Sequence, residues 1–145
     1  MNIQVVGLPC SGKSHYIEKI KSKYSFIKTV DIIQFDAPDR EQKCINFIKN
    51  TSSEDSLILI ESACGIQPLD CKVILVSTSA KKHKVYMKKR NCNYSIDNFS
   101  SIRDQIIPAN YTVYSYFAFE NLIKSILSGD DNAKRFFRNT RNSSI

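Results

Sequence analysis

Eight residues near the start of the chain have the types and spacing that phosphate binding requires: Gly7-Leu8-Pro9-Cys10-Ser11-Gly12-Lys13-Ser14. They satisfy the pattern G-x-x-x-x-G-K-[ST], in which the glycines let the backbone curl so that successive N–H groups point at phosphate oxygens. In this pattern Lys13 reaches the β- and γ-phosphates of a nucleotide, and the hydroxyl of Ser14 ligates Mg²⁺. The pattern predicts a nucleotide site formed by Gly7, Pro9, Cys10, Ser11, Gly12, Lys13 and Ser14.

Two acidic residues follow predicted strands and could complete this chemistry. Phosphoryl transfer needs a carboxylate at the metal, and Glu61, directly after the apolar run 57–60, is the one acid placed at the end of a central strand. The alternative is a solvated acid at a strand end. Asp31 ends the second predicted strand and could accept a proton from an acceptor hydroxyl. The alternative for Asp31 is a helix or turn cap, a role for which Asp36 and Asp39 compete.

A basic segment is the third feature that could act on phosphate. Six of the chain's 21 basic residues lie in the ten positions from Lys81 to Arg90, with no acidic residue among them. One hypothesis is a lid in which Arg90, with Lys84 or Lys88, neutralises charge on the transferring phosphoryl group. The alternative is a helix with a solvated lysine face.

This basic segment has few residues that could anchor it to the rest of the chain. Val85 and Met87 are its apolar residues apart from Tyr86, and we expect these two to be the anchors. His83 has no evident partner, so we predict a surface residue rather than a ligand or a base.

The elements that must position these residues alternate along the chain. Short apolar runs without helical period predict strands, and segments with apolar residues three or four apart predict helices. The predicted strands are 3–6, 26–30, 57–60, 73–76 and 112–117, and the predicted helices are 14–24, a segment around 44–48, 80–90, 99–107 and 119–127. Because the central runs are continuously apolar, both faces of the sheet must be covered. We predict an α/β sandwich with a parallel sheet between helices.

Length and charge bound the organisation of the chain. Its 145 residues suit one domain, predicted over residues 1–128, with a basic tail over residues 129–145. The formal net charge of +7 favours anionic partners. In the tail, Phe136 and Phe137 lie among arginines between Lys134 and Arg141, a combination that can stack on bases and contact phosphates. The alternative is that the two phenylalanines pack on the core.

Cysteine usage and hydropathy exclude several classes. The five cysteines are an odd number without a Cys-x-x-Cys pair, which argues against a disulfide framework or a four-ligand zinc site. No apolar run approaches the ~18 residues of a membrane span, and the N-terminus lacks the features of a secretory signal. We therefore expect a cytoplasmic protein with reduced thiols and no membrane partner.

The phosphate-binding segment also carries a family resemblance. It resembles the Gly-Leu-Pro-Gly-Ser-Gly-Lys-Ser-Thr opening of small P-loop kinases of the polynucleotide-kinase and zeta-toxin-like type, relatives of nucleoside monophosphate and shikimate kinases. The resemblance covers the order of elements from Asn2 to about Leu127, and the loop is its one specific motif. It implies a P-loop NTPase fold with a five-stranded parallel sheet of order 2-3-1-4-5, a basic lid after the fourth strand, and ATP with Mg²⁺ as the phosphoryl donor. It also implies an acid after the second strand that binds or deprotonates the acceptor, which Asp31 matches by its distance from the loop.

The sequence departs from this family at several positions. Polynucleotide kinases carry an arginine three residues after that acid, where this chain has Gln34, and Arg40 lies farther along. This difference weakens the case for a nucleic-acid 5′-hydroxyl as acceptor. Cys10 and His15 replace the usual glycine and threonine of the loop without changing the Mg²⁺ ligand. The lid has Arg90 but is mostly lysine, so point charges replace the bidentate arginine forks of the family.

These observations lead to two hypotheses about function. The first is an ATP-dependent kinase that transfers the γ-phosphate to a nucleoside, a nucleotide or a related metabolite, with Lys13, Asp31, Glu61 and Arg90 as catalytic residues. The second is a nucleotide-binding protein with little transfer activity, associated with nucleic acid or a viral assembly through residues 81–90 or the tail. The abundance of Ile, Lys, Asn and Ser suggests an AT-rich genome, such as that of a large virus or a parasite.

Overall fold

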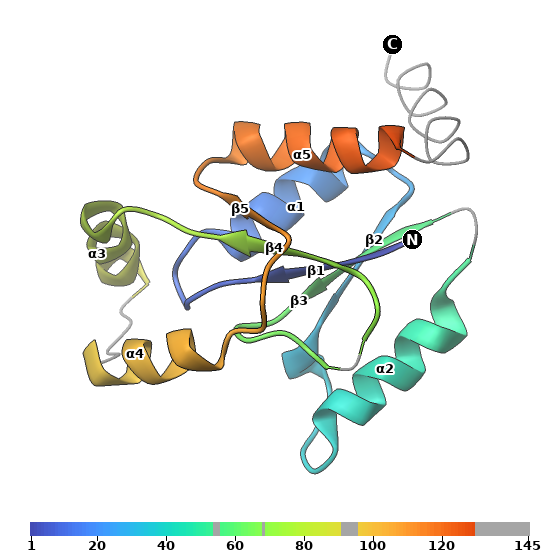
Figure 1. The fold of residues 1–145 in the computed structure, drawn as a ribbon, viewed down its shortest axis with the longest axis horizontal. Helices are drawn as coiled ribbons and strands as arrows, with labels where there is room; N and C mark the ends of the chain where they lie inside the picture. Colours follow the sequence, from blue (N-terminus) through green and yellow to red (C-terminus); the bar gives the residue numbers. More distant parts are fainter. Residues whose placement is uncertain (54–55, 68, 91–95, 130–145) are drawn as a thin grey trace.

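Strands and helices alternate along the chain, as the sequence predicts (Figure 1). A computed structural model describes residues 1–53, 56–67, 69–90 and 96–129. In chain order the elements are β1 (Asn2–Val6), α1 (Lys13–Lys23), β2 (Ile27–Asp31), the 3₁₀ turn η1 (Ile32–Gln34), α2 (Arg40–Thr51), β3 (Leu57–Glu61), β4 (Lys72–Val76), α3 (Ala80–Lys89), α4 (Ile96–Gln105), β5 (Tyr111–Val113) and α5 (Tyr116–Ser128). The five strands pair in parallel in the order β2-β3-β1-β4-β5. The α/β fold class and the strand order are confirmed.

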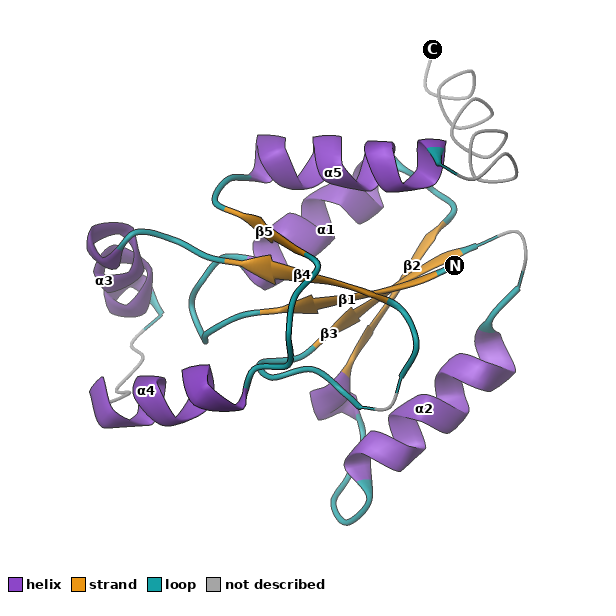
Figure 2. Cartoon of the chain, in the orientation of Figure 1, coloured by secondary structure: helices purple, strands orange, loops and turns teal. Residues whose placement is uncertain are grey.

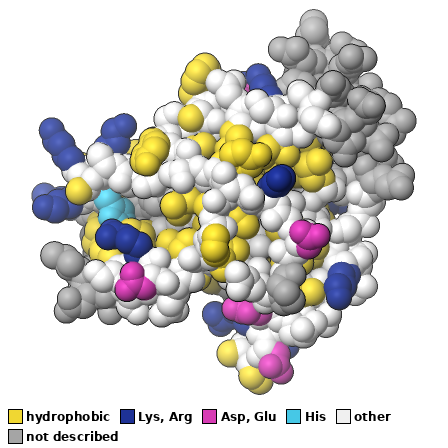
Figure 3. Space-filling view, viewed as in Figure 1, with side chains coloured by type: hydrophobic (Ala, Val, Ile, Leu, Met, Phe, Trp, Pro, Cys, Tyr) yellow, Lys and Arg dark blue, Asp and Glu magenta, His cyan; other side chains and the backbone are white. Residues whose placement is uncertain are grey.

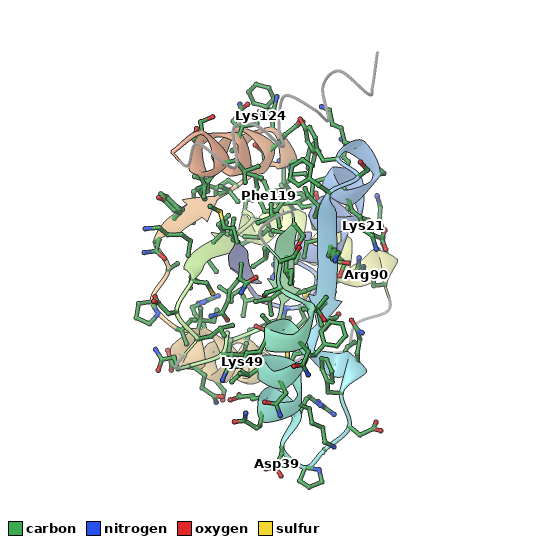
Figure 4. All side chains as sticks on the ribbon, turned by 90° about the vertical axis from the view of Figure 1, so that its right-hand side faces the viewer. Lys21, Asp39, Lys49, Arg90, Phe119 and Lys124 are labelled. Carbon is green, nitrogen blue, oxygen red and sulfur yellow. The ribbon has the colours of Figure 1, made fainter. Side chains whose placement is uncertain are left out.

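Helices cover both faces of the sheet (Figure 2). Helices α1 and α5 lie on one face, and α2 and α4 lie on the other. Alternate residues of β3 show why its apolar run is continuous: Leu57 and Leu59 belong to the core beneath α1 and α5, whereas Ile58 and Ile60 belong to the core beneath α2. Figure 4 shows Phe119 between α5 and the sheet, where it is fully buried. A strand covered on both faces needs apolar residues at successive positions, which is the pattern that the sequence carries.

Two boundaries near the end of the chain differ from the prediction. The strand predicted over 112–117 is shorter, because the Ser115 hydroxyl accepts a hydrogen bond from the Ala118 N–H (3.1 Å) and caps a helix that begins at Tyr116. The predicted helix 99–107 ends at Gln105, since the Ile107 N–H donates to the Cys64 carbonyl (2.8 Å) instead of continuing the helix. Local side-chain capping and a contact from a distant loop therefore decide these ends.

A buried amide holds the loop that follows β3 against β1. The Gln4 side chain is completely buried, and it donates to the Ile66 carbonyl (3.0 Å) and accepts from the Ile66 N–H (2.7 Å). Farther along, the Gly7 N–H donates to the Ala63 carbonyl (3.1 Å). These bonds join the start of the phosphate-binding segment to the residues just after Glu61, so that both sit at the carboxyl edge of the sheet.

Two further predictions concern the C-terminal tail and membrane-spanning helices. The tail residues 130–145, including the segment from Lys134 to Arg141, lie outside the described residues. None of the helices in the described ranges is both long and apolar enough to cross a membrane.

Candidate functional site

The segment from Gly7 to Ser14 forms a tight loop between β1 and α1. A side chain at Gly7 would collide with β4, because a Cβ there would lie 2.5 Å from the Val76 carbonyl oxygen. Gly12 has φ of 105°, a backbone conformation that favours glycine, and it caps the start of α1. The N-terminus of α1 therefore points its free N–H groups into the loop, as an anion site requires.

Lys13 lies inside this loop and is only 9% exposed. Its ammonium group donates a hydrogen bond to the Gly7 carbonyl. Burial lowers the pKa of Lys13, and the nearby carboxylates of Glu61 and Asp31 oppose that shift. The ammonium group is thus held inside the loop, where its hydrogen-bond acceptor is a neutral carbonyl oxygen rather than an anionic oxygen such as that of a phosphate.

Ser14 and Glu61 are in direct contact. The Ser14 hydroxyl donates to Glu61 Oε1 (2.6 Å). In the pairing of β2 with β3, Glu61 lies beside Asp31, so two carboxylates are neighbours at the sheet edge. Burial raises the pKa of Glu61, and Asp31 raises it further, while the Ser14 hydrogen bond and the Lys13 charge oppose the rise.

This donor set suits Mg²⁺. Mg²⁺ prefers oxygen ligands and binds proteins through one or two carboxylates together with substrate phosphates. Ser14 and Glu61 offer a hydroxyl and a carboxylate oxygen that already touch, and a cation would offset the burial that raises the pKa of Glu61. Among the described residues no three His, Cys, Asp or Glu side chains cluster as a metal site.

Asp31 has the capping role that the sequence offered as one of two alternatives. Its Oδ1 accepts a hydrogen bond from the Ile33 N–H (3.1 Å), while the Gln34 side chain accepts from the Asp31 N–H (2.8 Å), so Asp31 caps η1. Asp31 also faces the cavity next to the loop. Gln34, which stands where polynucleotide kinases have arginine, is thus a partner in this cap.

All four candidate catalytic residues line one cavity of about 360 Å³. Lys13, Asp31, Glu61 and Arg90 share its wall with the predicted loop residues from Pro9 to Ser14. The remaining lining is small or apolar and comes from the ends of β2 and β3: Ile32, Ile33, Ser62 and Ala63. Phosphate ligands, the carboxylates and the lid arginine therefore meet in one space, although they come from four separate segments.

The helix α3 lies beyond the carboxyl end of β4, with one face toward the loop (Figure 1). His83 and Met87 are its half-buried residues, and Tyr86 and Arg90 line a second cavity of about 330 Å³ beside Gly12 and Tyr16. The lysines of α3 are exposed, although Lys89 also lines this second cavity, and Figure 3 shows basic side chains standing out at this end of the molecule. Figure 4 shows Arg90 at the end of this helix.

The structure corrects two expectations about α3. Val85 is 47% exposed and does not anchor the helix. The prediction of a surface His83 is also wrong: its Nε2 lies 2.7 Å from the Pro9 carbonyl oxygen, and its ring packs 4.8 Å from that of Phe99. The spacing of His83, Met87 and Arg90 places them on one helix face, and this is the pattern in the sequence that could have indicated a packed His83. Lys84 and Lys88, the predicted helpers of Arg90, are exposed.

A third cavity, of about 340 Å³, lies behind the loop. It is bordered by Leu8 and Ser11, by the end of β4, and by His83, Arg103 and Ile106. No local pattern in the sequence points to Arg103, because α4 comes close to the loop only in the folded chain.

Comparison with solved structures identifies the fold. The chain is similar to an unliganded sugar kinase from Janibacter (TM-score 0.62, 13% identity, covering 88% of this chain and 92% of that one). It is also similar to the shikimate kinase of Aquifex aeolicus (TM-score 0.56, 15% identity, 89% and 97%). The shikimate kinase of Acinetobacter baumannii in complex with shikimate is a third (TM-score 0.54, 14% identity, 90% and 94%). The chain therefore has the P-loop NTPase fold that these kinases share.

No family model matches the sequence, and no match was found among curated proteins. The narrower resemblance to polynucleotide kinases and zeta-toxin-like proteins receives no support from these comparisons.

The raised pKa of Glu61 leads to a prediction about stability. A carboxyl group whose pKa is raised on folding favours the native state at low pH, and this contribution is lost as pH rises through the raised pKa. Glu61→Gln keeps an oxygen for the Ser14 hydroxyl and removes the charge. In EDTA at neutral pH, we expect the variant to melt about 1–3 °C above the unsubstituted protein.

This difference should shrink as pH falls through the raised pKa and vanish below about pH 4, where Glu61 is protonated in both the folded and the unfolded state. Thermal unfolding between pH 4 and pH 8 measures it. A Glu61→Gln variant that melts below the unsubstituted protein at neutral pH would show that the Glu61 charge stabilises the metal-free fold.

Proposed function

We propose that the chain is an ATP-dependent phosphotransferase that moves the γ-phosphate to a small acceptor. The observation that carries the proposal is the single cavity shared by the loop, the Ser14–Glu61 pair, Asp31 and Arg90. Residues 1–128 would form this kinase-like unit, and residues 129–145 a basic tail. The structural neighbours are kinases of sugars and shikimate, which supports a transferase without identifying the acceptor.

In this proposal the loop and Lys13 bind the donor. The N–H groups of the loop and the start of α1 would hold the β- and γ-phosphates, and Lys13 would exchange the Gly7 carbonyl for a phosphate oxygen. Ser14 and Glu61 would hold Mg²⁺, which neutralises charge on the β- and γ-phosphates when it is bound. ATP and Mg²⁺ are therefore the expected cofactors.

Asp31 and Arg90 would serve the transfer itself. The acceptor oxygen would form a bond to the γ-phosphorus while the bond from that phosphorus to the bridging oxygen breaks, and ADP leaves. The proton of the acceptor hydroxyl would pass to the Asp31 carboxylate. Arg90, on the cavity wall, would offset charge on the transferring group. A nucleoside, a nucleotide or a related metabolite is the proposed acceptor.

The first prediction is that transfer depends on Lys13. Purified protein with γ-labelled ATP and Mg²⁺ should label at least one member of a panel of nucleosides, nucleotides, sugars and oligonucleotide 5′ ends. Lys13→Ala should reduce the labelling about 100-fold or more, because it removes the cation on the transferring phosphates. Lys21→Ala, an exposed lysine on the same helix, is the matched control and should keep the rate.

Survival of transfer in Lys13→Ala at close to the unsubstituted rate would show that the loop does not carry the reaction.

The second prediction separates the two roles of Asp31. Asn caps a turn about as well as Asp, so Asp31→Asn should keep the fold and the melting temperature. It cannot take the acceptor proton, so kcat should fall by about 10²- to 10⁴-fold. The affinity for ATP, measured by calorimetry, should stay within about threefold because Asp31 does not contact the donor in this proposal.

Asp36→Asn, in the exposed loop after η1, is the control and should retain kcat. An Asp31→Asn enzyme as fast as the unsubstituted one would limit Asp31 to its capping role.

The alternative function has one observation in its favour. The lysines of α3 are exposed, so they are available to a polyanion. If nucleic acid is the partner, affinity for DNA or RNA should fall steeply with salt, survive Lys13→Ala and disappear when the lysines between Lys81 and Arg90 are neutralised. Binding that is weak at all salt concentrations would remove this alternative.

A further inference from the structure

His83 joins two parts of the site that are far apart in the sequence. It lies in the first turns of α3, and its Nε2 is 2.7 Å from the carbonyl oxygen of Pro9, 74 positions earlier. A carbonyl oxygen can only accept a hydrogen bond, so Nε2 carries the proton and donates it. The lid helix and the phosphate-binding loop are therefore connected by a specific hydrogen bond.

The packing around the imidazole fixes its direction. The ring lies against Phe99 of α4, with centroids 4.8 Å apart and planes at 54°. The backbone at the base of the helix is held as well, because the Ser79 hydroxyl accepts from the Lys82 N–H (3.2 Å) and the His83 N–H donates to the Ser79 carbonyl (2.9 Å). The ring is therefore held by its packing against Phe99 and by the hydrogen bond from Nε2 to Pro9.

The acceptor of this bond belongs to an unusual peptide unit. Cys10 has φ of 63°, a left-handed conformation that is unfavourable for a residue with a side chain. The carbonyl of Pro9 and the N–H of Cys10 belong to one planar trans peptide, in which the two groups point in opposite directions. A donor that holds the Pro9 carbonyl therefore also sets the direction of the Cys10 N–H.

We propose that His83 is a positioning residue that holds the Pro9–Cys10 peptide so that the Cys10 N–H points into the phosphate cavity. Pro9 and Cys10 both line that cavity and His83 does not, so the hydrogen bond from His83 to the Pro9 carbonyl turns the Cys10 N–H away from His83. This inference rests on the proposed function, because it assigns the N–H to the phosphates of a bound nucleotide.

The same contact sets the position of the lid. Arg90 lies seven residues after His83, two helical turns along the same face, and it lines the phosphate cavity. Holding His83 against the loop therefore also brings Arg90 to the cavity. One side chain thus couples the geometry of the donor site to the cation that would act on the transferring group.

Three substitutions separate hydrogen bonding from packing. His83→Phe keeps a flat ring against Phe99 and loses the donor, whereas His83→Gln keeps an N–H donor of similar reach. Binding of a fluorescent ADP analogue with Mg²⁺ to the full chain should weaken about tenfold in His83→Phe and stay within about threefold in His83→Gln. Val85→Ala, on the exposed side of α3, is the control and should bind like the unsubstituted chain.

Equal binding by His83→Phe and the unsubstituted chain would overturn the proposal. So would equally weak binding by His83→Phe and His83→Gln at unchanged melting temperature, because an N–H donor at position 83 would then not restore binding. A second readout does not need nucleotide: long-range ¹H–¹⁵N spectra at about pH 8 should show the imidazole proton of His83 on Nε2. A proton on Nδ1 would contradict the hydrogen bond.

This pair of readouts distinguishes the two proposals. If the unsubstituted chain binds no nucleotide while the Nε2 proton is present, the proposed function fails and with it the role in phosphate binding, but the contact between α3 and the loop stands.

Discussion

The ammonium group of Lys13 lies inside a loop closed by Gly7, largely withdrawn from water but within the field of Glu61 and Asp31. A buried cation is costly unless it has hydrogen bonds and an opposite charge nearby, and here the Gly7 carbonyl and the two acids supply these only in part. The acids bear a cost of their own, since burial and their mutual proximity raise the pKa of Glu61. A phosphate and a divalent cation bound together would satisfy both sets of groups, and for this reason we propose a metal–nucleotide complex as the ligand.

The surrounding fold keeps this arrangement in place. Parallel pairing of β2 with β3 puts Asp31 beside Glu61, and the close approach of Gly7 to the Val76 backbone leaves no room for a side chain there. Helix α3 adds the third boundary through His83. Its lysines are exposed, and of its basic residues Lys89 and Arg90 line a cavity beside the loop. The net charge of the chain is therefore a poorer guide to this site than the few basic residues of α3 that lie next to the loop.

The sequence predicted those parts of the molecule that depend on short stretches of chain. The loop from Gly7 to Ser14 is local, and the apolar runs of the central strands have the same pattern in any sheet covered on both faces, so both were predictable. Asp31 and Glu61 could be placed at the sheet edge because each directly follows a strand. The contact of His83 with Pro9 could not be foreseen, since it depends on how α3 packs against a loop 74 positions away. The early start of α5 was missed because the cap at Ser115 outweighs the β propensity of the aromatic residues around it.

A crystal structure of the chain with Mg²⁺ and a non-hydrolysable ATP analogue would show whether Lys13 and Ser14 bind the phosphoryl donor. We expect the β- and γ-phosphates to lie in the loop, Lys13 Nζ to have exchanged the Gly7 carbonyl for phosphate oxygens, and Mg²⁺ to be bound at Ser14. An analogue bound outside the loop, or a Lys13 that still donates to Gly7 with the nucleotide present, would contradict this binding mode.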